Sequence, residues 1–280
     1  MNALKTLNHY TPEDILEMDY NHIIGIVKET NRPPGGINSL ACIAQKIFLG
    51  PNKHVLEIGT STGFTAIELA RLTHCNISAI DINPESLAEA KFRAKENNIE
   101  DKIKFIEMDA TEINFNNELF DLVFCGNVTS LIPNRKKALK EYSRVLKNNG
   151  YLAAIPIYYL ETPSDQLLSN VSKAIQVDLK PIYKDYWIDF FNQKPLHIFY
   201  QEDYQFDFIS DKYIKKFTNQ ILSRPHLKLL NTHTKEMLCQ RYQELMLLFR
   251  DNLAKMGYTI LILRKEENSF DPELFTSSKV

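Results

Sequence analysis

Apolar residues follow two different spacings along this chain, and segments of the two kinds alternate. Short, mostly apolar runs, such as Ile77 to Ile80 and Phe120 to Phe124, are typical of buried strands. Longer segments, such as residues 64–72 and 84–97, place apolar side chains at helical spacing. The predicted strands cover residues 55–58, 77–80, 103–107, 120–124 and 151–155. Strands that alternate with helices predict an α/β fold with a parallel sheet.

The N-terminal region has a helical pattern and contains no predicted strand. Thr11-Pro12-Glu13-Asp14 is typical of a capped helix start with proline in the first turn. Arg32 to Gly36 ends that helix, and Ile37 to Leu49 is predicted to form another. We therefore expect residues 1–50 to form a helical cap that precedes the sheet.

A second helical region follows the fifth strand. Residues 166–177 and 184–192 are predicted helices, and residues 207–256 are predicted to form two more, at 210–223 and 234–256. The last of these carries one apolar stripe, formed by Leu238, Tyr242, Leu245, Phe249 and Leu253. Such a stripe must be buried against the rest of the fold, a partner or a ligand.

Length, charge and cysteine content narrow the function classes. A chain of 280 residues can bury one large core, so we expect one domain with appendages. The net charge of −2 gives no electrostatic reason to expect a nucleic-acid partner. The four cysteines are scattered, which predicts a reducing compartment and neither a disulfide framework nor a zinc site. Because no signal segment or bilayer-spanning run is visible, we expect a cytoplasmic protein with no membrane partner.

The segment from His54 to Gly63 carries the clearest chemical signal. A short apolar strand runs into small and hydroxyl residues and then into a helix, which is the opening unit of a nucleotide-binding α/β domain. A dinucleotide fingerprint needs glycine at position 61 and glycine or alanine at position 64, where this chain has Ser61 and Phe64. The spacing therefore argues against a dinucleotide.

An acidic residue followed by small residues at alternate positions describes this segment better. These residues are Glu57, Gly59, Ser61 and Gly63. The pattern resembles the first motif of the class I S-adenosylmethionine (SAM) dependent methyltransferases, with serine in place of the middle glycine. The resemblance extends motif by motif over residues 54–160, and more loosely over 197–204 and 258–264. It implies a seven-stranded Rossmann-like sheet in the order 3-2-1-4-5-7-6, with strand 7 antiparallel.

The resemblance also implies that the cofactor is SAM and the product S-adenosyl-L-homocysteine. The turn that would lie against the methionine part of SAM contains Glu57, Gly59, Thr60, Ser61, Thr62 and Gly63. Asp81, at the end of the second strand, is in the place of an acid that accepts the ribose hydroxyls, and Ile82 follows it. Asp109 and Ala110 match positions beside the adenine. Gly126 and Asn127 follow the fourth strand, where the transferable methyl is expected.

These implications divide the chain into four parts. The SAM-binding core covers residues 51–206 and 257–266, the cap residues 1–50, the insertion residues 207–256 and a tail residues 267–280. In this fold, strand 6 ends and the antiparallel strand 7 begins at the carboxyl edge, where ligands bind. We therefore expect the insertion to be a lid over the methyl acceptor.

The acceptor site is less defined than the cofactor site. The sulfonium of SAM is an activated donor, so the protein mainly aligns the acceptor and excludes water. Tyr158 and Tyr159, which follow strand five, are candidate acceptor contacts. A general base is needed only for an acceptor that is protonated at the working pH, and Glu161, His22 and Asp185 are the candidates.

Two aromatic residues close in sequence to His22 and Asp185 receive different predictions. In this superfamily, helices before the first strand often close over the cofactor, which makes Tyr20 and His22 candidates to face the site, but the pattern favours ordinary helix packing for both. Trp187 is expected to be a core residue, on a helix that packs against the sheet.

The residues after strand four bear on metal dependence. Catechol-type relatives that use a metal carry an acidic ligand there, whereas this chain has Gly126 and Asn127, so we expect a metal-independent enzyme. The predicted function is methyl transfer to a small or medium-sized metabolite. Methylation of a peptide or protein side chain and SAM binding without catalysis remain alternatives. The sequence leaves the acceptor and the oligomeric state open.

Overall fold

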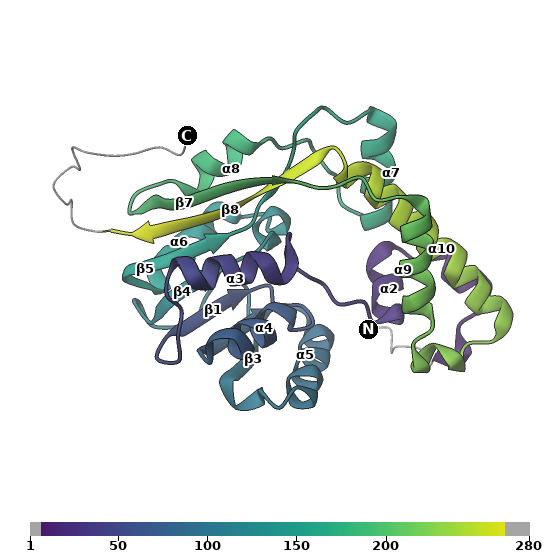
Figure 1. The fold of residues 1–280 in the computed structure, drawn as a ribbon, viewed down its shortest axis with the longest axis horizontal. Helices are drawn as coiled ribbons and strands as arrows, with labels where there is room; N and C mark the ends of the chain where they lie inside the picture. Colours follow the sequence, from purple (N-terminus) through teal and green to yellow (C-terminus); the bar gives the residue numbers. More distant parts are fainter. Residues whose placement is uncertain (1–6, 267–280) are drawn as a thin grey trace. The chain divides into compact units, whose positions relative to one another are not determined.

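The computed structural model describes residues 7–266 (Figure 1). The expected tail at 267–280 and the first six residues of the expected cap lie outside the described residues. The chain divides into two compact units. The helical unit comprises the described residues up to Asn31, Ile157–Tyr186 and Asp203–Tyr258. The sheet unit comprises Arg32–Pro156, Trp187–Glu202 and the described residues from Thr259 onward.

Parallel strands form the centre of the sheet unit, as the hydrophobic pattern predicts. They are β1 (His54–Ile58), β2 (Asn76–Asp81), β3 (Ile103–Glu107), β4 (Phe120–Phe124) and β5 (Leu146–Ala154). β1 pairs with β2 and β4, β2 with β3, and β4 with β5. Helices flank this sheet, so the central strands are buried on both faces (Figure 1). That burial explains why their sequences are mostly apolar and do not alternate regularly between apolar and polar residues.

Two long strands complete the sheet. β8 (Met256–Lys265) runs antiparallel to β5, with Ala154 opposite Leu261. β7 (Leu196–Gln205) pairs with β8, and hydrogen bonds from Phe206 N to Met256 O (3.2 Å) and from Glu266 N to Pro195 O (2.9 Å) make this pair antiparallel too. The order β3-β2-β1-β4-β5-β8, with β7 beside β8, confirms the predicted fold class and strand order. A short strand that was not predicted, β6 (Ile157–Tyr159), pairs with Met256–Tyr258.

The helices of the sheet unit follow the strands in the expected alternation. α3 (Gly36–Lys46) packs on α4 (Phe64–Thr73), α5 (Pro84–Glu96) on β3, and α6 (Arg135–Val145) on β5. Asn83 caps α5 by accepting the N–H groups of Glu85 and Ser86. In α8 (Lys184–Phe191), Trp187 is buried against Phe190 and Phe191, which confirms its predicted place in the core.

The helical unit has a core of its own. Its helices are α1 (Pro12–Glu17), α2 (Tyr20–Val27), α7 (Asp165–Ile175), α9 (Asp211–Leu222) and α10 (Thr232–Leu253). Of the predicted stripe on α10, Leu238, Tyr242 and Leu245 are buried in this core and Phe249 packs against it. The predicted cap of α1 forms as a capping box between Thr11 and Asp14. Short 3-10 helices lie at Leu7–His9, Glu100–Lys102, Val128–Leu131 and Pro225–Leu229.

The expected division into cap, core and insertion stays a prediction, and two segments near its boundaries fall into the compact units as follows. Residues 36–46 belong to the sheet unit because α3 packs on α4. Residues 157–186 belong to the helical unit, in which α7 packs on α10. Within residues 7–266, no helix combines the length and the apolar character that crossing a membrane requires.

Candidate functional site

The turn between β1 and α4 adopts a conformation that only particular residues allow. Gly59, Ser61 and Gly63 all have positive φ, at 70°, 48° and 84°. A Cβ atom on Gly59 would lie 2.5 Å from Cγ2 of Val128, and one on Gly63 would lie 2.9 Å from Cβ of Ala90. Both glycines are therefore required by backbone conformation and by space. The turn packs closely against the segment after β4 and against α5.

Backbone hydrogen bonds join this turn to the end of β2. The N–H groups of Gly59 and Thr60 both donate to the Ile80 carbonyl, at 2.9 and 3.0 Å. The Ser61 N–H donates to Oδ2 of Asp81 at 2.8 Å, and the Asn83 N–H donates to Oδ1 of the same side chain at 3.0 Å. Each carboxylate oxygen has a second lone pair, so Asp81 can accept further hydrogen bonds while it holds the turn.

Glu57 lies beneath the turn and is almost fully buried, with 3% of its surface exposed. The Thr60 hydroxyl donates to Oε2 of Glu57 at 2.7 Å. Burial raises the pKa of Glu57 to about 7, although hydrogen bonds from Thr60 and Thr65 oppose that rise. The Glu57 carboxyl group is therefore inaccessible to solvent, and its hydrogen bond with Thr60 helps to fix the conformation of the turn.

The ends of β2, β3 and β4 bring the other predicted cofactor residues to the same edge of the sheet. Ile82 is an exposed apolar side chain, with 71% of its surface accessible. Asp109 is exposed, and the Thr111 N–H donates to its Oδ1 at 2.7 Å, which lowers the pKa of Asp109; Ala110 beside it is buried. Gly126 has a positive φ of 39°, and its carbonyl accepts the Ile155 N–H at 2.8 Å.

Asn127 and Thr62 complete the predicted set. The Asn127 carbonyl accepts the Ser130 hydroxyl at 2.7 Å, so the loop after β4 closes on itself. The Thr62 hydroxyl accepts a hydrogen bond from Nη1 of Arg93 on α5 at 3.0 Å, and Arg93 also pairs with Glu89. The predicted cofactor residues thus lie on loops at the carboxyl ends of parallel strands, where ligands of open α/β sheets bind.

Two features of this edge were not identified from the sequence. Val128 closes over Gly59, and the loop before α3 carries Arg32 beside the turn. The guanidinium carbon of Arg32 lies 5.0 Å from the ring centroid of Phe64, the first residue of α4. The only sequence signal for this loop is the run Pro33-Pro34-Gly35-Gly36, which indicates a turn without saying what the turn contacts.

The predicted acceptor residues belong to the helical unit, and the structure does not gather them into one cluster. Tyr158 and Tyr159 are buried, and the Tyr159 hydroxyl donates to Oδ1 of Asn252 at 2.7 Å. Glu161 is exposed and pairs with Lys255. His22 is exposed, and its Nδ1 lies 2.8 Å from Oδ1 of Asp19. Their roles toward an acceptor stay predictions.

The two remaining candidates are also placed by the structure. Asp185 is exposed in the first turn of α8. Tyr20 packs edge-on against Phe249 with ring centroids 4.5 Å apart, and burial raises the pKa of its hydroxyl. Tyr20 is therefore part of the packing of the helical unit.

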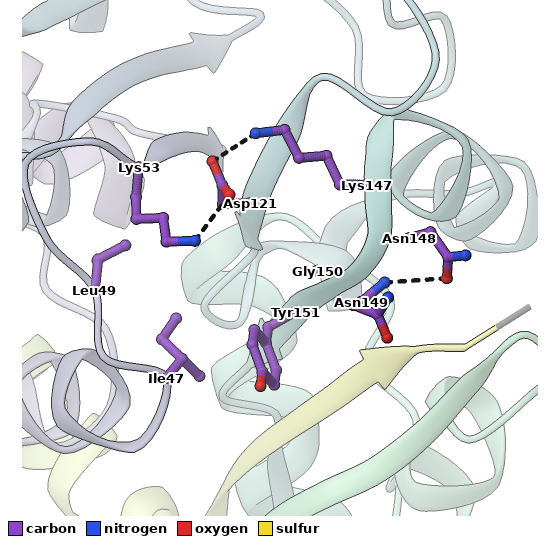
Figure 2. A pocket seen from close by; sticks show the side chains of 9 residues that line it. All are labelled: Ile47, Leu49, Lys53, Asp121, Lys147, Asn148, Asn149, Gly150 and Tyr151. Atoms are coloured by element: carbon purple, nitrogen blue, oxygen red, sulfur yellow. Dashed lines mark hydrogen bonds and ion pairs between the residues drawn. The ribbon is translucent and has the colours of Figure 1, made fainter. Parts of the chain in front are cut away.

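A separate pocket lies at the opposite, amino-terminal edge of the sheet (Figure 2). It is lined by Ile47, Leu49, Lys53, Asp121, Lys147, Asn148, Asn149, Gly150 and Tyr151. Its one carboxylate, Asp121, pairs with both of its lysines, with Lys53 at 3.2 Å and with Lys147 at 2.9 Å. Among the residues that the structure describes, no group of three or more His, Cys, Asp or Glu side chains is arranged to hold a metal ion.

Comparison with known sequences identifies the family of this chain. A family model described as a methyltransferase domain matches residues 49–194. An uncharacterized protein of Haemophilus influenzae is 31% identical over 179 residues, which cover 63% of this chain and 71% of that protein. Sterol 24-C-methyltransferase of Saccharomyces cerevisiae is 33% identical over 111 residues, which cover 40% of this chain and 29% of that enzyme. The chain thus matches less than a third of the sterol enzyme's length.

Solved structures have the same fold. The MccD protein superposes with a TM-score of 0.73 at 24% identity, over 84% of this chain and all of that chain. A SAM-dependent methyltransferase from Geobacter sulfurreducens, solved with S-adenosyl-L-homocysteine, superposes with a TM-score of 0.63 at 16% identity, over 89% of this chain and 99% of that chain. At these identities, the likeness establishes the fold.

Proposed function

The chain belongs to the methyltransferase-domain family, and we propose that it transfers the methyl group of SAM to a small or medium-sized molecule. As a member of this family it is a SAM-dependent methyltransferase. The observation that carries the assignment of the site is the Gly59–Gly63 turn, held from one side by the carboxylate of Asp81. The acceptor class and the individual residue roles below are our proposal.

The residues at this edge fit SAM by their chemistry. Asp81 offers carboxylate lone pairs for the ribose hydroxyls, and Ile82 offers an exposed apolar surface for the adenine ring. The second oxygen of Asp109 is suited to an exocyclic amine, next to the Ala110 backbone. The turn presents backbone without side-chain bulk at two of its five positions, Gly59 and Gly63. Glu57 and Thr60 are positioning residues that hold this turn from below.

SAM, when bound, supplies a methyl group on a positively charged sulfur that is already activated for transfer. The chain then has to bind, orient and exclude water. The loop at Gly126 and Asn127, after β4, would border the acceptor side, because it follows the strand next to the turn. Because no cluster of oxygen ligands is found among the described residues, we propose that transfer does not depend on a metal.

We propose a small-molecule acceptor on the basis of the relatives and of the insertion. Related enzymes are a sterol 24-C-methyltransferase and a C-methyltransferase of ubiquinone and menaquinone biosynthesis. In this chain, the insertion between β7 and β8 leaves and re-enters at paired strand ends, since Phe206 N donates to Met256 O. The first residues of β8 pair with β6, and from Leu261 onward β8 pairs with β5, whose carboxyl end is Ala154. This connectivity supports a lid function for α9 and α10.

Methyl-labelled SAM tests the proposed reaction. The purified chain is incubated with labelled SAM and a fractionated metabolite extract, and we expect label in a small-molecule fraction. Asp81→Ala, with weakened SAM binding, serves as the matched negative control. Label in added protein or peptide instead would favour side-chain methylation. SAM binding without transfer to any fraction would favour a non-catalytic subunit.

Hydrogen exchange tests the lid function better than removal of the insertion does. α10 supplies core residues of the helical unit, so its deletion would expose apolar surface for reasons unrelated to the acceptor. We expect S-adenosyl-L-homocysteine alone to slow exchange in the β1–α4 turn. Addition of the active acceptor fraction is then expected to slow exchange in α9 and α10. Unchanged exchange in both helices with acceptor bound would contradict the lid.

A further inference from the structure

Arg32 places a positive charge beside the first turn of α4. Its guanidinium carbon lies 5.0 Å from the ring centroid of Phe64, which directly follows Gly63. A cation over an aromatic face is held by the ring quadrupole and keeps its in-plane N–H groups available for other partners. Arg32 is exposed, so these donors are accessible to a ligand.

The loop that carries Arg32 is well anchored. The Gly36 N–H donates to the Pro33 carbonyl at 2.9 Å, and the buried Ser39 hydroxyl donates to the Pro34 carbonyl at 2.8 Å. Two successive prolines restrict the backbone of this loop further. Cβ of Pro33 lies 3.9 Å from the place that a Cβ on Gly126 would take. The loop therefore runs between the β1–α4 turn and the end of β4, and it holds Arg32 at the candidate cofactor site.

The charge of Arg32 is not neutralised by a carboxylate within residues 7–266. Arg93, the other arginine at this turn, differs in this respect, because its Nε lies 2.8 Å from Oε1 of Glu89. A second feature adds to the positive potential at the same place: α4 begins at Gly63 with no side chain that caps its first turn. The uncapped first turn of α4 and the Arg32 guanidinium together create a positive potential that suits an anion.

We propose that Arg32 binds the α-carboxylate of the methionine part of SAM and so makes the site selective for the whole cofactor. This inference rests on the proposed cofactor turn, against which that part of SAM would lie. A carboxylate is the one anionic group of SAM, and a guanidinium matches it with two parallel N–H donors. The prolines and the Phe64 ring hold Arg32 in place before the cofactor binds, which lowers the entropy cost of the contact.

Two ligands that differ only in the amino-acid part test this proposal. S-adenosyl-L-homocysteine carries the carboxylate, whereas 5′-methylthioadenosine retains the adenosine and sulfur but lacks the amino-acid part. In calorimetry, we expect Arg32→Ala to weaken S-adenosyl-L-homocysteine about ten- to hundredfold and to leave 5′-methylthioadenosine within about twofold. Arg32→Lys should recover part of the loss, because it keeps the charge without the fork.

Arg71→Ala is the matched control. Arg71 lies in the last turn of the same helix and pairs with Glu68 on its exposed surface, so both affinities should stay at the wild-type value. Equal binding of S-adenosyl-L-homocysteine by wild type and Arg32→Ala would overturn the role of Arg32. Equal weakening of both ligands would overturn it too, by showing that the loop, not the carboxylate, is affected. Failure of the wild-type chain to bind either ligand would instead overturn the proposed function itself.

Discussion

Two aspartates at opposite edges of one sheet differ in the groups that pair with their carboxylates, and only one of them is proposed to bind a ligand. Asp121, at the amino end of β4, accepts the His54 N–H at 3.0 Å and pairs with both Lys53 and Lys147. Asp81, at the carboxyl end of β2, accepts only the backbone N–H groups of Ser61 and Asn83, and no lysine or arginine in residues 7–266 pairs with it.

The groups that surround each aspartate, and not the residue type, therefore determine whether its carboxylate is free to accept a ligand. Although burial opposes the effect, hydrogen bonds from His54 N–H and the two lysines hold the pKa of Asp121 below its ordinary value. That carboxylate accepts three hydrogen bonds, two of them from lysines, and it fastens β4 to the start of β1. Asp81 accepts two backbone N–H groups and no charged donor, and it keeps unsatisfied lone pairs at an edge where ligands bind. The comparison predicts opposite consequences for changes at the two edges.

The largest expected effect comes from filling the space at a glycine. In Gly59→Ala, the new Cβ would lie 2.5 Å from Val128 Cγ2 in a backbone with φ of 70°. We expect a loss of about 2–5 kcal/mol of unfolding free energy, from overpacking and left-handed strain, together with loss of SAM binding. Gly50→Ala, at the amino edge, is the control, since a Cβ there meets nothing within 4 Å. Denaturant unfolding measures both, and equal effects of the two changes would remove the asymmetry between the edges.

The second prediction uses the opposite pKa shifts of carboxylates at the two edges. The folded pKa of Glu57 is raised from 4.5 to about 7, so the folded chain binds more protons than the unfolded chain between these values. Its contribution to stability is therefore lost as pH rises through this window, by about 3 kcal/mol in total. Glu57→Gln should gain stability relative to wild type by that order between pH 4.5 and pH 7.

Asp121 supplies the contrasting case. Its folded pKa lies below the ordinary value of 3.8, so the stability it contributes is complete at neutral pH and is lost as pH falls through the acid range. Asp121→Asn should therefore be less stable than wild type at neutral pH, and the difference in unfolding free energy should disappear only in acid. Urea unfolding of both variants over a range of pH checks these signs. A Glu57→Gln difference that does not change with pH would contradict the raised pKa.

The third prediction concerns binding alone. Asp81→Ala should weaken SAM by roughly 1–3 kcal/mol, because hydrogen bonds to a charged acceptor are lost and the turn loses its partner at Ser61. Asp121→Ala should cost a similar amount in unfolding free energy but leave SAM affinity within about twofold. Calorimetry with unchanged SAM affinity in Asp81→Ala would refute the role given to this residue.

The last prediction is that removal of metal ions has no effect on methyl transfer. Neither edge, within the described range, has a cluster of residues arranged to bind a metal. We expect methyl transfer to proceed at the same rate with excess EDTA as without it. A rate that disappears with EDTA and returns with Mg²⁺ would show that an oxygen-rich site forms with substrate or cofactor.

The sequence predicted the features of this molecule that depend on local pattern. The apolar runs at 77–80 and 120–124 belong to strands that are buried on both faces, so their strand character did not depend on knowing their neighbours. The spacing from Glu57 to Gly63 likewise reflects a local backbone requirement, which the positive φ values at Gly59 and Gly63 now explain. The motif and the strand positions were therefore accessible before any contact was known, whereas the strand order came from the family resemblance.

Features that depend on distant contacts were not accessible. β6 has three residues and exists only because Met256–Tyr258 lies beside it, far along the chain. Arg32 lies over Phe64 through the packing of its loop, and no periodicity links the two positions. Tyr158 and Tyr159 are buried by the same long-range packing, which a position after strand five does not indicate.

The helical unit is assembled from distant parts of the chain, and this matters while the protein is being synthesised. The Thr234 hydroxyl donates to the Tyr10 carbonyl at 3.2 Å across 224 residues, and α10 packs on α1. The apolar faces of α1 and α2 therefore leave the ribosome long before α10, on which both helices pack, exists. Strands β1 to β5 pair with one another and are all synthesised by residue 154. Because nearby contacts form before distant ones, α1 and α2 are expected to settle after strands β1 to β5, although they are synthesised before them.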